Sequence, residues 1–311
     1  MKKSIGFFCC TNGFGHYKRV YEVAKFLKED YNITIYCNKS QTDKLGKLPS
    51  VNYVYYKYNN IKWDEINSDK DSRFKNFYKD WCSFYGPKTR NHDLVISDNI
   101  VELLFYRPDT ILMGSFFWKD VVFSSLGTNS LTERDEWLLK TYKPLVLTNK
   151  YVETQSMKTY KNKVQSGFGP DKRRLIFSDT LTNLVNKSSL KYSNTYSDFI
   201  SQLTKAGLAF TDDFSYIDNT IMFARPGVGT ITHCVENCIP LVALYDDNDS
   251  QEIIELAQVV EDLNLGFKQN VNRPFRSVEY SKWHSNVNLL YGDKLELNGY
   301  KNISNYIKSC L

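Results

Sequence analysis

The stretch CCTNGFGHYKR, residues 9–19, lies where the first apolar run of the chain ends. Before it, residues 4–10 (SIGFFCC) are mostly apolar, which is typical of a strand covered on both faces of a parallel sheet. After it, apolar residues recur at helical spacing at Val20, Val23, Ala24 and Leu27. Residues 32–37 (NITIYC) then predict a second strand. We therefore expect the glycine turn at the carboxyl end of the first strand, where open α/β sheets bind ligands.

This turn differs from a dinucleotide-binding loop. Such a loop has a third glycine where this chain has Lys18, and an acid after the second strand where this chain has Asn38. The sequence also lacks a phosphate loop ending in Gly-Lys-Ser/Thr. Gly13 and Gly15 are therefore expected to expose backbone amides together with His16. The alternative is a tight turn in which His16 is only a polar residue of the first helical turn.

The composition is that of a globular chain. The 311 residues allow one large domain or two ordinary ones, and a hydrophobic content of 42% supports well-filled cores. The net charge of +5 is compatible with an anionic ligand. It is too small to indicate a nucleic-acid-binding protein, so nucleic acid stays open only as an acceptor. We expect neither a signal peptide nor a transmembrane segment. Seven scattered cysteines indicate the reducing cytoplasm.

Further apolar runs continue the first half, and one of them ends in an acid. Strands are expected at residues 51–56, 93–98, 110–114 and 145–148. If the strands are parallel, Asp98 shares a sheet edge with His16, where an aspartate can orient an imidazole and stabilise its protonated form. We predict His16 and Asp98 as the catalytic pair. The alternative for Asp98 is a solvent-exposed loop acid.

The stretch TIMFARPGVGTITHCVENCIPLVALYDDNDSQ, residues 220–251, predicts a second unit of the same kind. The expected elements are a strand (220–224), a turn (225–229), a helix (230–238) and a strand (241–245). Gly227 and Gly229 free the backbone just before the helix, and Thr230 is expected to cap its amides. These amides and the helix dipole favour an anion such as a phosphate.

The two motifs together resemble a known family. GFGHYKR (13–19) and RPGVGTITHCVENCIP (225–240), followed by DSQ (249–251), are similar to the GT-B glycosyltransferases. The resemblance is greatest to the group of the bacterial muramoyl-pentapeptide N-acetylglucosaminyltransferase and to relatives with a Gly-x-Gly-His-x-x-Arg opening. It implies an α/β fold of two Rossmann-like domains facing across a cleft. The domains implied are an acceptor-side domain (1–165), a nucleotide-sugar domain (166–280) and C-terminal helices packing back on the first (281–311).

The resemblance also implies roles for individual residues. His16 matches the general base, or a contact to the transferred group. The implied donor contacts are Gly13, Gly15, Arg225, Gly227, Val228, Gly229, Thr230, His233, Asp249 and Gln251, with the diphosphate at the 227–230 loop and the sugar hydroxyls at Gln251. UDP is the expected nucleotide, although His233 stands where the group carries an acid that contacts the ribose.

Two metal-site interpretations are less favoured. Cys234 and Cys238 share an apolar stripe of the expected helix, which indicates small buried thiols rather than ligands beside His233. Residues 246–249 (DDND) resemble an acidic metal motif, but their place after a strand of the second unit favours a donor-sugar loop. No metal site and no resident cofactor are expected, since the nucleotide sugar is a co-substrate.

The predicted reaction is transfer of a sugar from a nucleotide-diphosphate donor to an acceptor hydroxyl. A free imidazole has a pKa near 6.5, which suits His16 as the base, and the loop amides stabilise the leaving diphosphate. The acceptor is a carbohydrate, a lipid-linked sugar or a small metabolite, with the aromatic segments 74–81 and 116–120 as candidate contacts. One alternative is a nucleotide-sugar hydrolase, because relatives whose opening also carries the arginine matched by Arg19 use water as acceptor. Another is a binding module without turnover.

Overall fold

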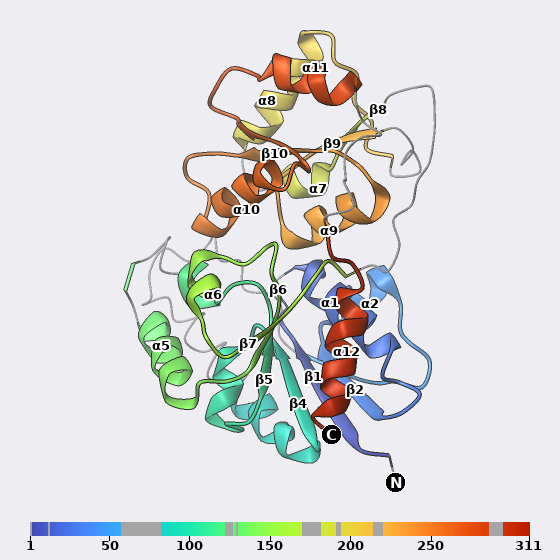
Figure 1. The fold of residues 1–311 in the computed structure, drawn as a ribbon, viewed down its shortest axis with the longest axis vertical. Helices are drawn as coiled ribbons and strands as arrows, with labels where there is room; N and C mark the ends of the chain where they lie inside the picture. The colour runs from blue at the N-terminus through green and yellow to red at the C-terminus, as the bar shows by residue number, and fades with distance from the viewer. Residues whose placement is uncertain are drawn as a thin grey trace. The chain divides into compact units, whose positions relative to one another are not determined.

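The computed structural model describes residues 2–11, 13–56, 82–121, 127–128, 130–169, 182–190, 194–213, 220–285 and 295–311. The chain divides into two compact units. Unit 1 comprises Met1–Gly169 and Asn298–Leu311, and unit 2 comprises Pro170–Leu297. The chain therefore leaves unit 1 once and returns to it for its last helix (Figure 1). The predicted aromatic segment 74–81 lies outside the described residues.

Unit 1 is built on a parallel sheet of seven strands in the order β3-β2-β1-β4-β5-β6-β7. The strands are β1 (Ser4–Cys9), β2 (Asn32–Cys37), β3 (Asn52–Tyr55), β4 (Leu94–Asp98), β5 (Ile111–Met113), β6 (Val146–Asn149) and β7 (Lys163–Ser166). The apolar runs predicted the first six. The edge strand β7 (KVQS) was not predicted, because it is short and mostly polar.

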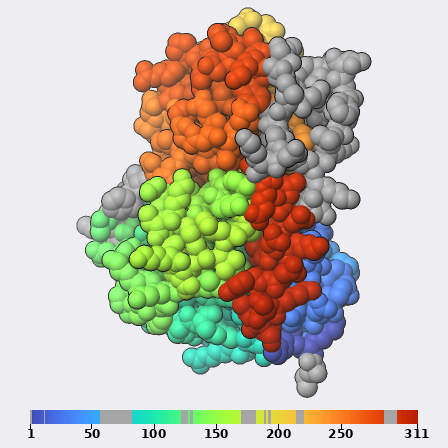
Figure 2. All heavy atoms as spheres, viewed as in Figure 1, coloured from blue at the N-terminus to red at the C-terminus, as the bar shows by residue number. Residues whose placement is uncertain are grey.

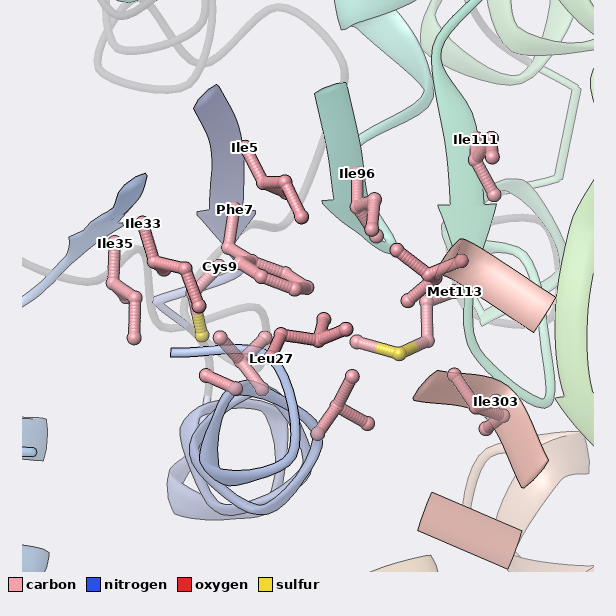
Figure 3. Close-up of a cluster of buried hydrophobic side chains, with 14 of the residues drawn as sticks. Ile5, Phe7, Cys9, Leu27, Ile33, Ile35, Ile96, Ile111, Met113 and Ile303 are labelled. Carbon is pink, nitrogen blue, oxygen red and sulfur yellow. The ribbon is translucent and has the colours of Figure 1, made fainter. Parts of the chain in front are cut away.

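Helices cover the unit 1 sheet. The α-helices are α1 (Phe14–Lys25), α2 (Lys39–Leu45), α5 (Ser130–Tyr142), α6 (Gln155–Thr159) and α12 (Gly299–Ser309), with the 3-10 helices η2 (Gly86–Asn91) and η3 (Val101–Phe105). One face of the sheet packs on α1 and α12: Figure 3 shows Phe7 and Met113 pointing toward Leu27 and Ile303. Burying each such side chain contributes about 1.5–3 kcal/mol, so this core fixes α1 on this face of the sheet.

The last helix, α12, completes unit 1 from the far end of the sequence. It packs against α1 and β7, and Figure 2 shows its red residues at the surface beside the rest of unit 1. The Ser304 hydroxyl donates to the Val23 carbonyl over 3.1 Å. A Cβ atom on Gly299 would lie 2.3 Å from the Gly167 carbonyl oxygen, so only glycine fits at this close approach. Residues 281–311 are thus divided, because α11 (Ser277–Ser285) belongs to unit 2.

Unit 2 is built on a parallel sheet in the order β11-β10-β9-β8. The strands are β8 (Thr182–Val185), β9 (Thr220–Ala224), β10 (Leu241–Tyr245) and β11 (Gly266–Asn270), and the other helices are α7 (Lys187–Leu190), α8 (Asn194–Lys205), α9 (Val228–Asn237) and α10 (Gln251–Asp262). Phe223, Val242 and Phe267 pack against Tyr196 of α8 and Trp283 of α11. Among the described segments of both units, every helix is too short or too polar to cross a bilayer.

Candidate active site

His16 lies in the first turn of α1, beside the end of the neighbouring strand β4. β1 and β4 are parallel with Cys9 opposite Asp98, so both strands end at the same edge of the sheet. The Nδ1 atom of His16 is 2.6 Å from Oδ1 of Asp98. Because an ionised carboxylate only accepts hydrogen bonds, this contact assigns a proton to Nδ1.

The other ring nitrogen of His16 is available for chemistry. With the proton on Nδ1, a neutral imidazole carries its lone pair on Nε2. Within the described part of the chain, Nε2 makes no hydrogen bond, and the His16 side chain is 10% exposed. This is the state in which a histidine can take a proton from a substrate hydroxyl.

Arg19, one helical turn after His16, holds the same carboxylate. Its Nε donates to Oδ2 of Asp98 and its Nη2 to Oδ1, each over 2.8 Å. Asp98 is fully buried; burial raises its pKa, but the charges and hydrogen bonds of Arg19 and His16 outweigh this and hold the pKa below its usual value. For Arg19, burial by itself lowers the pKa. The charge of Asp98 and its hydrogen bonds raise it by more, so the pKa of Arg19 lies above its usual value. Asp98 is therefore ionised near neutral pH, and it orients His16.

The glycine turn before His16 is braced by a side chain that sequence reasoning missed. The Nε2 group of Gln41 donates to the backbone carbonyls of Cys10 and Gly13 over 2.9 Å each. Its Oε1 atom accepts a hydrogen bond from the backbone amide of Asn38. Gly13 has φ +90°, and Gly15 is the second residue of α1. The pattern Asn38-x-x-Gln41, a capping box at the start of α2, was the available signal.

Two aromatic side chains of the predicted 116–120 segment lie against His16. The ring centroid of Phe116 is 6.3 Å from that of His16, and the centroid of Trp118 is 6.0 Å away. The two aromatic rings meet edge to face at 5.1 Å. They form an apolar wall beside the imidazole, which lowers the local dielectric and offers a surface for stacking.

In unit 2, the start of α9 differs from the prediction. The helix begins at Val228, with Gly227 as an N-cap in extended conformation and no side-chain cap. The expected capping by Thr230 was wrong, because this residue is already the third of the helix. No described atom lies within 4 Å of a Cβ atom placed on Gly227. The amides of Val228, Gly229 and Thr230 are thus first-turn donors with no side chain capping them, as an anion site needs.

Arg225, just before this helix, is held by Asp249. The Nε and Nη2 atoms of Arg225 lie 2.9 Å from Oδ1 of Asp249. The other oxygen, Oδ2, accepts from the Tyr196 hydroxyl and from the Asp246 amide. Burial lowers the pKa of Arg225, but the attraction of Asp249 raises it by more. Both oxygens of Asp249 accept hydrogen bonds from groups of the protein, and Asp249 thereby positions Arg225. The contact from Tyr196 was not predicted from the sequence.

The remaining predicted donor contacts lie on α9 and α10. His233 is one turn after Thr230 on α9, and its Nδ1 is 3.2 Å from Nδ2 of Asn237. Gln251 is the exposed first residue of α10, and its Nε2 donates to Glu255 over 3.1 Å. Within the described residues, no group of three or more His, Cys, Asp or Glu side chains is arranged to hold a metal ion.

Comparisons with known proteins give the fold a name. No family model and no curated protein matches the chain. The kitacinnamycin glycotransferase structure is 12% identical, with 100% of this chain and 99% of the other covered and a TM-score of 0.60. MurG of Acinetobacter baumannii is 10% identical, with 98% and 99% covered and a TM-score of 0.57. Arabidopsis thaliana UGT89C1, complexed with UDP-L-rhamnose, is 12% identical, with 100% of each chain covered and a TM-score of 0.58.

The chain has the GT-B fold. At these identities the likeness establishes the architecture, and the chemistry has to be argued from the residues. In this GT-B chain the predicted site residues fall into two groups. Unit 1 holds Gly13, Gly15, His16 and Asp98, and unit 2 holds Arg225, Gly227, Val228, Gly229, Thr230, His233, Asp249 and Gln251.

Proposed function

We propose that this protein is a glycosyltransferase that moves a sugar from a UDP-sugar to an acceptor hydroxyl. The observation that carries the proposal is the buried His16–Asp98–Arg19 network, which leaves the Nε2 atom of His16 available as a base. The GT-B fold supports it, because the structures that resemble this chain are glycosyltransferases. The proposed setting is the cytoplasm, and the acceptor is a carbohydrate, a lipid-linked sugar or a small metabolite.

In the proposed reaction, the acceptor oxygen attacks the anomeric carbon as its proton passes to Nε2 of His16. The bond between that carbon and the diphosphate oxygen breaks, and its electron pair leaves with the diphosphate. Asp98 stabilises the imidazolium that forms, while Arg19 keeps Asp98 ionised, so the proton stays on the histidine. General-base help of this kind is worth about 10²–10⁴ in rate.

The leaving diphosphate is proposed to bind at the start of α9. First-turn amides and the helix dipole favour negative charge there, and Arg225, held in place by Asp249, adds a guanidinium whose positive charge the ion pair partly offsets. These groups stabilise the departing charge without a metal ion or a resident cofactor in the scheme. UDP is the nucleotide proposed, since one similar structure holds UDP-L-rhamnose, with His233 as the candidate ribose contact.

The test combines donor binding with donor turnover. Thermal shift with UDP, UDP-glucose, UDP-N-acetylglucosamine and the corresponding GDP and dTDP sugars should single out a donor that raises the melting temperature. Release of the nucleotide diphosphate from that donor should fall by about 10²–10⁴ in His16→Ala. Binding of UDP should persist in that variant, since the diphosphate site lies in unit 2. Unchanged release in His16→Ala, or a lack of any nucleotide shift, would contradict the proposal.

A nucleotide-sugar hydrolase is the second candidate. It is favoured by Arg19, which completes the Gly-x-Gly-His-x-x-Arg opening that is similar to such hydrolases and which the structure ties to Asp98. Release of free sugar at full rate without an added acceptor supports the hydrolase. Acceptor-dependent release supports the transferase.

A further inference from the structure

Two buried polar side chains without hydrogen-bond partners lie at the carboxyl edge of the unit 1 sheet. Asn99 directly follows β4 and is 4% exposed, and Thr148 in β6 is 2% exposed. In the described structure, Nδ2 of Asn99 and Oγ1 of Thr148 have no hydrogen-bond partner. A buried polar group left unpaired costs about 1–3 kcal/mol, so two in one place point to a ligand that completes them.

Asn99 and Thr148 lie close together, because Gly114 occupies the position between them in the sheet. The strand register puts Asn99, Gly114 and Thr148 in one row, just beyond the residues paired between β4, β5 and β6. A Cβ atom on Gly114 would lie 2.3 Å from Oδ1 of Asn99, so the carboxamide occupies the space above the glycine. Neighbouring strands lie about 4.8 Å apart, which puts this carboxamide about one strand spacing from Thr148.

This polar pair adjoins the candidate catalytic residues. Asn99 is the next residue after Asp98, and it is held at φ +64°, a left-handed conformation that asparagine tolerates better than most residues. Phe116 and Trp118, which lie against His16, follow Gly114 by two and four residues. The pair therefore sits at the same sheet edge as the base.

We propose that Asn99 and Thr148 form a subsite for an uncharged oxygen group, a hydroxyl or carbonyl, of the acceptor. This inference rests on the proposed function and specifies how the acceptor is recognised. The side-chain amide of Asn99 donates a hydrogen bond to the ligand oxygen, and the Thr148 hydroxyl donates or accepts a second hydrogen bond. Both groups are neutral, so the pair suits a sugar hydroxyl better than a phosphate.

The test uses two variants and a matched control. Thr148→Val replaces the hydroxyl with a methyl group of the same shape, and Asn99→Gly removes the carboxamide while keeping a residue that accepts positive φ. Asn264→Gly makes the same change at an asparagine with φ 54° in unit 2. The probe is methyl β-D-glucopyranoside, and its binding is followed by saturation-transfer NMR and titration.

We expect the wild-type protein and Asn264→Gly to bind the probe equally. Thr148→Val and Asn99→Gly should each bind about three- to tenfold more weakly, as for the loss of one hydrogen bond. The melting temperature of Thr148→Val should be unchanged or higher, because no hydrogen bond within the protein is lost. Equal binding by all four proteins, or no binding to the wild type, would overturn the subsite. A lower melting temperature in Thr148→Val with unchanged probe binding would show a structural water instead and also overturn it.

The same samples separate this inference from the proposed function. Binding of UDP is measured by titration and depends on the α9 loop and Arg225 of unit 2, not on Asn99 or Thr148. Loss of probe binding in the two variants supports the subsite even when UDP fails to bind. A failure of UDP to bind would then contradict only the proposal that the donor is a UDP-sugar. Normal UDP binding with equal probe binding in all variants retains the donor site and rejects the subsite.

Discussion

The starts of α1 and α9 follow the same order of elements but differ in backbone and in chemistry: the N-cap Gly13 has φ +90°, whereas the N-cap Gly227 is extended. Each helix follows a buried parallel strand and a glycine N-cap, and neither has a side-chain cap. At α1, the end of β4 supplies Asp98, which Arg19 keeps ionised and which orients His16. At α9, the loop after β10 supplies Asp249, which holds Arg225 beside uncapped amides. The order strand, glycine turn and helix thus does not set the chemistry, and the residues supplied by the neighbouring strand distinguish the proposed base site from the proposed anion site.

The largest expected effect is at the α1 site. Asp98→Asn replaces one carboxylate oxygen by an NH2 donor and leaves one oxygen for the donors of Arg19. The proton on Nδ1 of His16 then loses its acceptor, so kcat should fall by about 10³–10⁴, as when the tautomer of a catalytic histidine is lost. Steady-state kinetics with the identified donor measures this. UDP affinity, which we propose to depend on the α9 site, should change less than twofold. A kcat within tenfold of wild type would show that Asp98 does not orient a base.

The ion pair between Asp98 and Arg19 also predicts an effect on the free energy of unfolding. Removing Asp98 leaves the Arg19 side chain, which is only 15% exposed, without its partner, and this should cost about 3–5 kcal/mol of unfolding free energy at pH 7. The folded-state pKa of Asp98 is lowered, so its contribution is present above the unfolded pKa of about 3.9 and is lost as pH falls through the folded value. Urea unfolding of wild type and Asp98→Ala should therefore differ most near neutral pH and converge below about pH 4. A constant difference would contradict this linkage.

The third prediction concerns the α9 site. Arg225→Ala should weaken UDP binding by about 10- to 100-fold, because a charge-assisted hydrogen bond contributes about 1.5–3 kcal/mol. Asp249→Asn should weaken it less, about two- to tenfold, since Asp249 acts through the position of Arg225. Isothermal titration with UDP distinguishes the two. A larger loss in Asp249→Asn, with UDP-sugar affected more than UDP, would instead make Asp249 a direct sugar contact.

The smallest expected effect is at Thr230. An N-cap threonine contributes about 0.5–2 kcal/mol, but Thr230 is inside α9 and caps nothing. Thr230→Ala should therefore change the unfolding free energy by less than about 0.5 kcal/mol in urea denaturation. Destabilisation by 1 kcal/mol or more would show that α9 begins later in solution and that its first amides are not available to a ligand.

Much of this arrangement was predictable from periodicity and spacing. The six strands of unit 1 with apolar runs were predicted, and Asp98 was expected beside His16 because parallel strands end at one edge. The bidentate contact of Arg19 with Asp98 was not predicted, since the motif gives the residue but not its partner. Gln41 was missed because its capping box indicates only a helix start, not the two carbonyls it also binds. The contacts of Asp249 with Tyr196 and Arg225 were not predicted, and its assignment to the sugar donor stays a prediction.

The sequence by itself determined the local units: two strand, glycine turn and helix segments, the residue types at each turn and the apolar faces that pack. These follow from short-range periodicity and backbone freedom. Only the tertiary structure decided which distant residues meet. Arg19 and Asp98, whose contact was not predicted, are 79 positions apart, and the Ser304 hydroxyl reaches the Val23 carbonyl 281 positions away. Strand order and helix docking set these contacts, and both depend on how whole faces bury apolar surface together, which no local pattern of residues records.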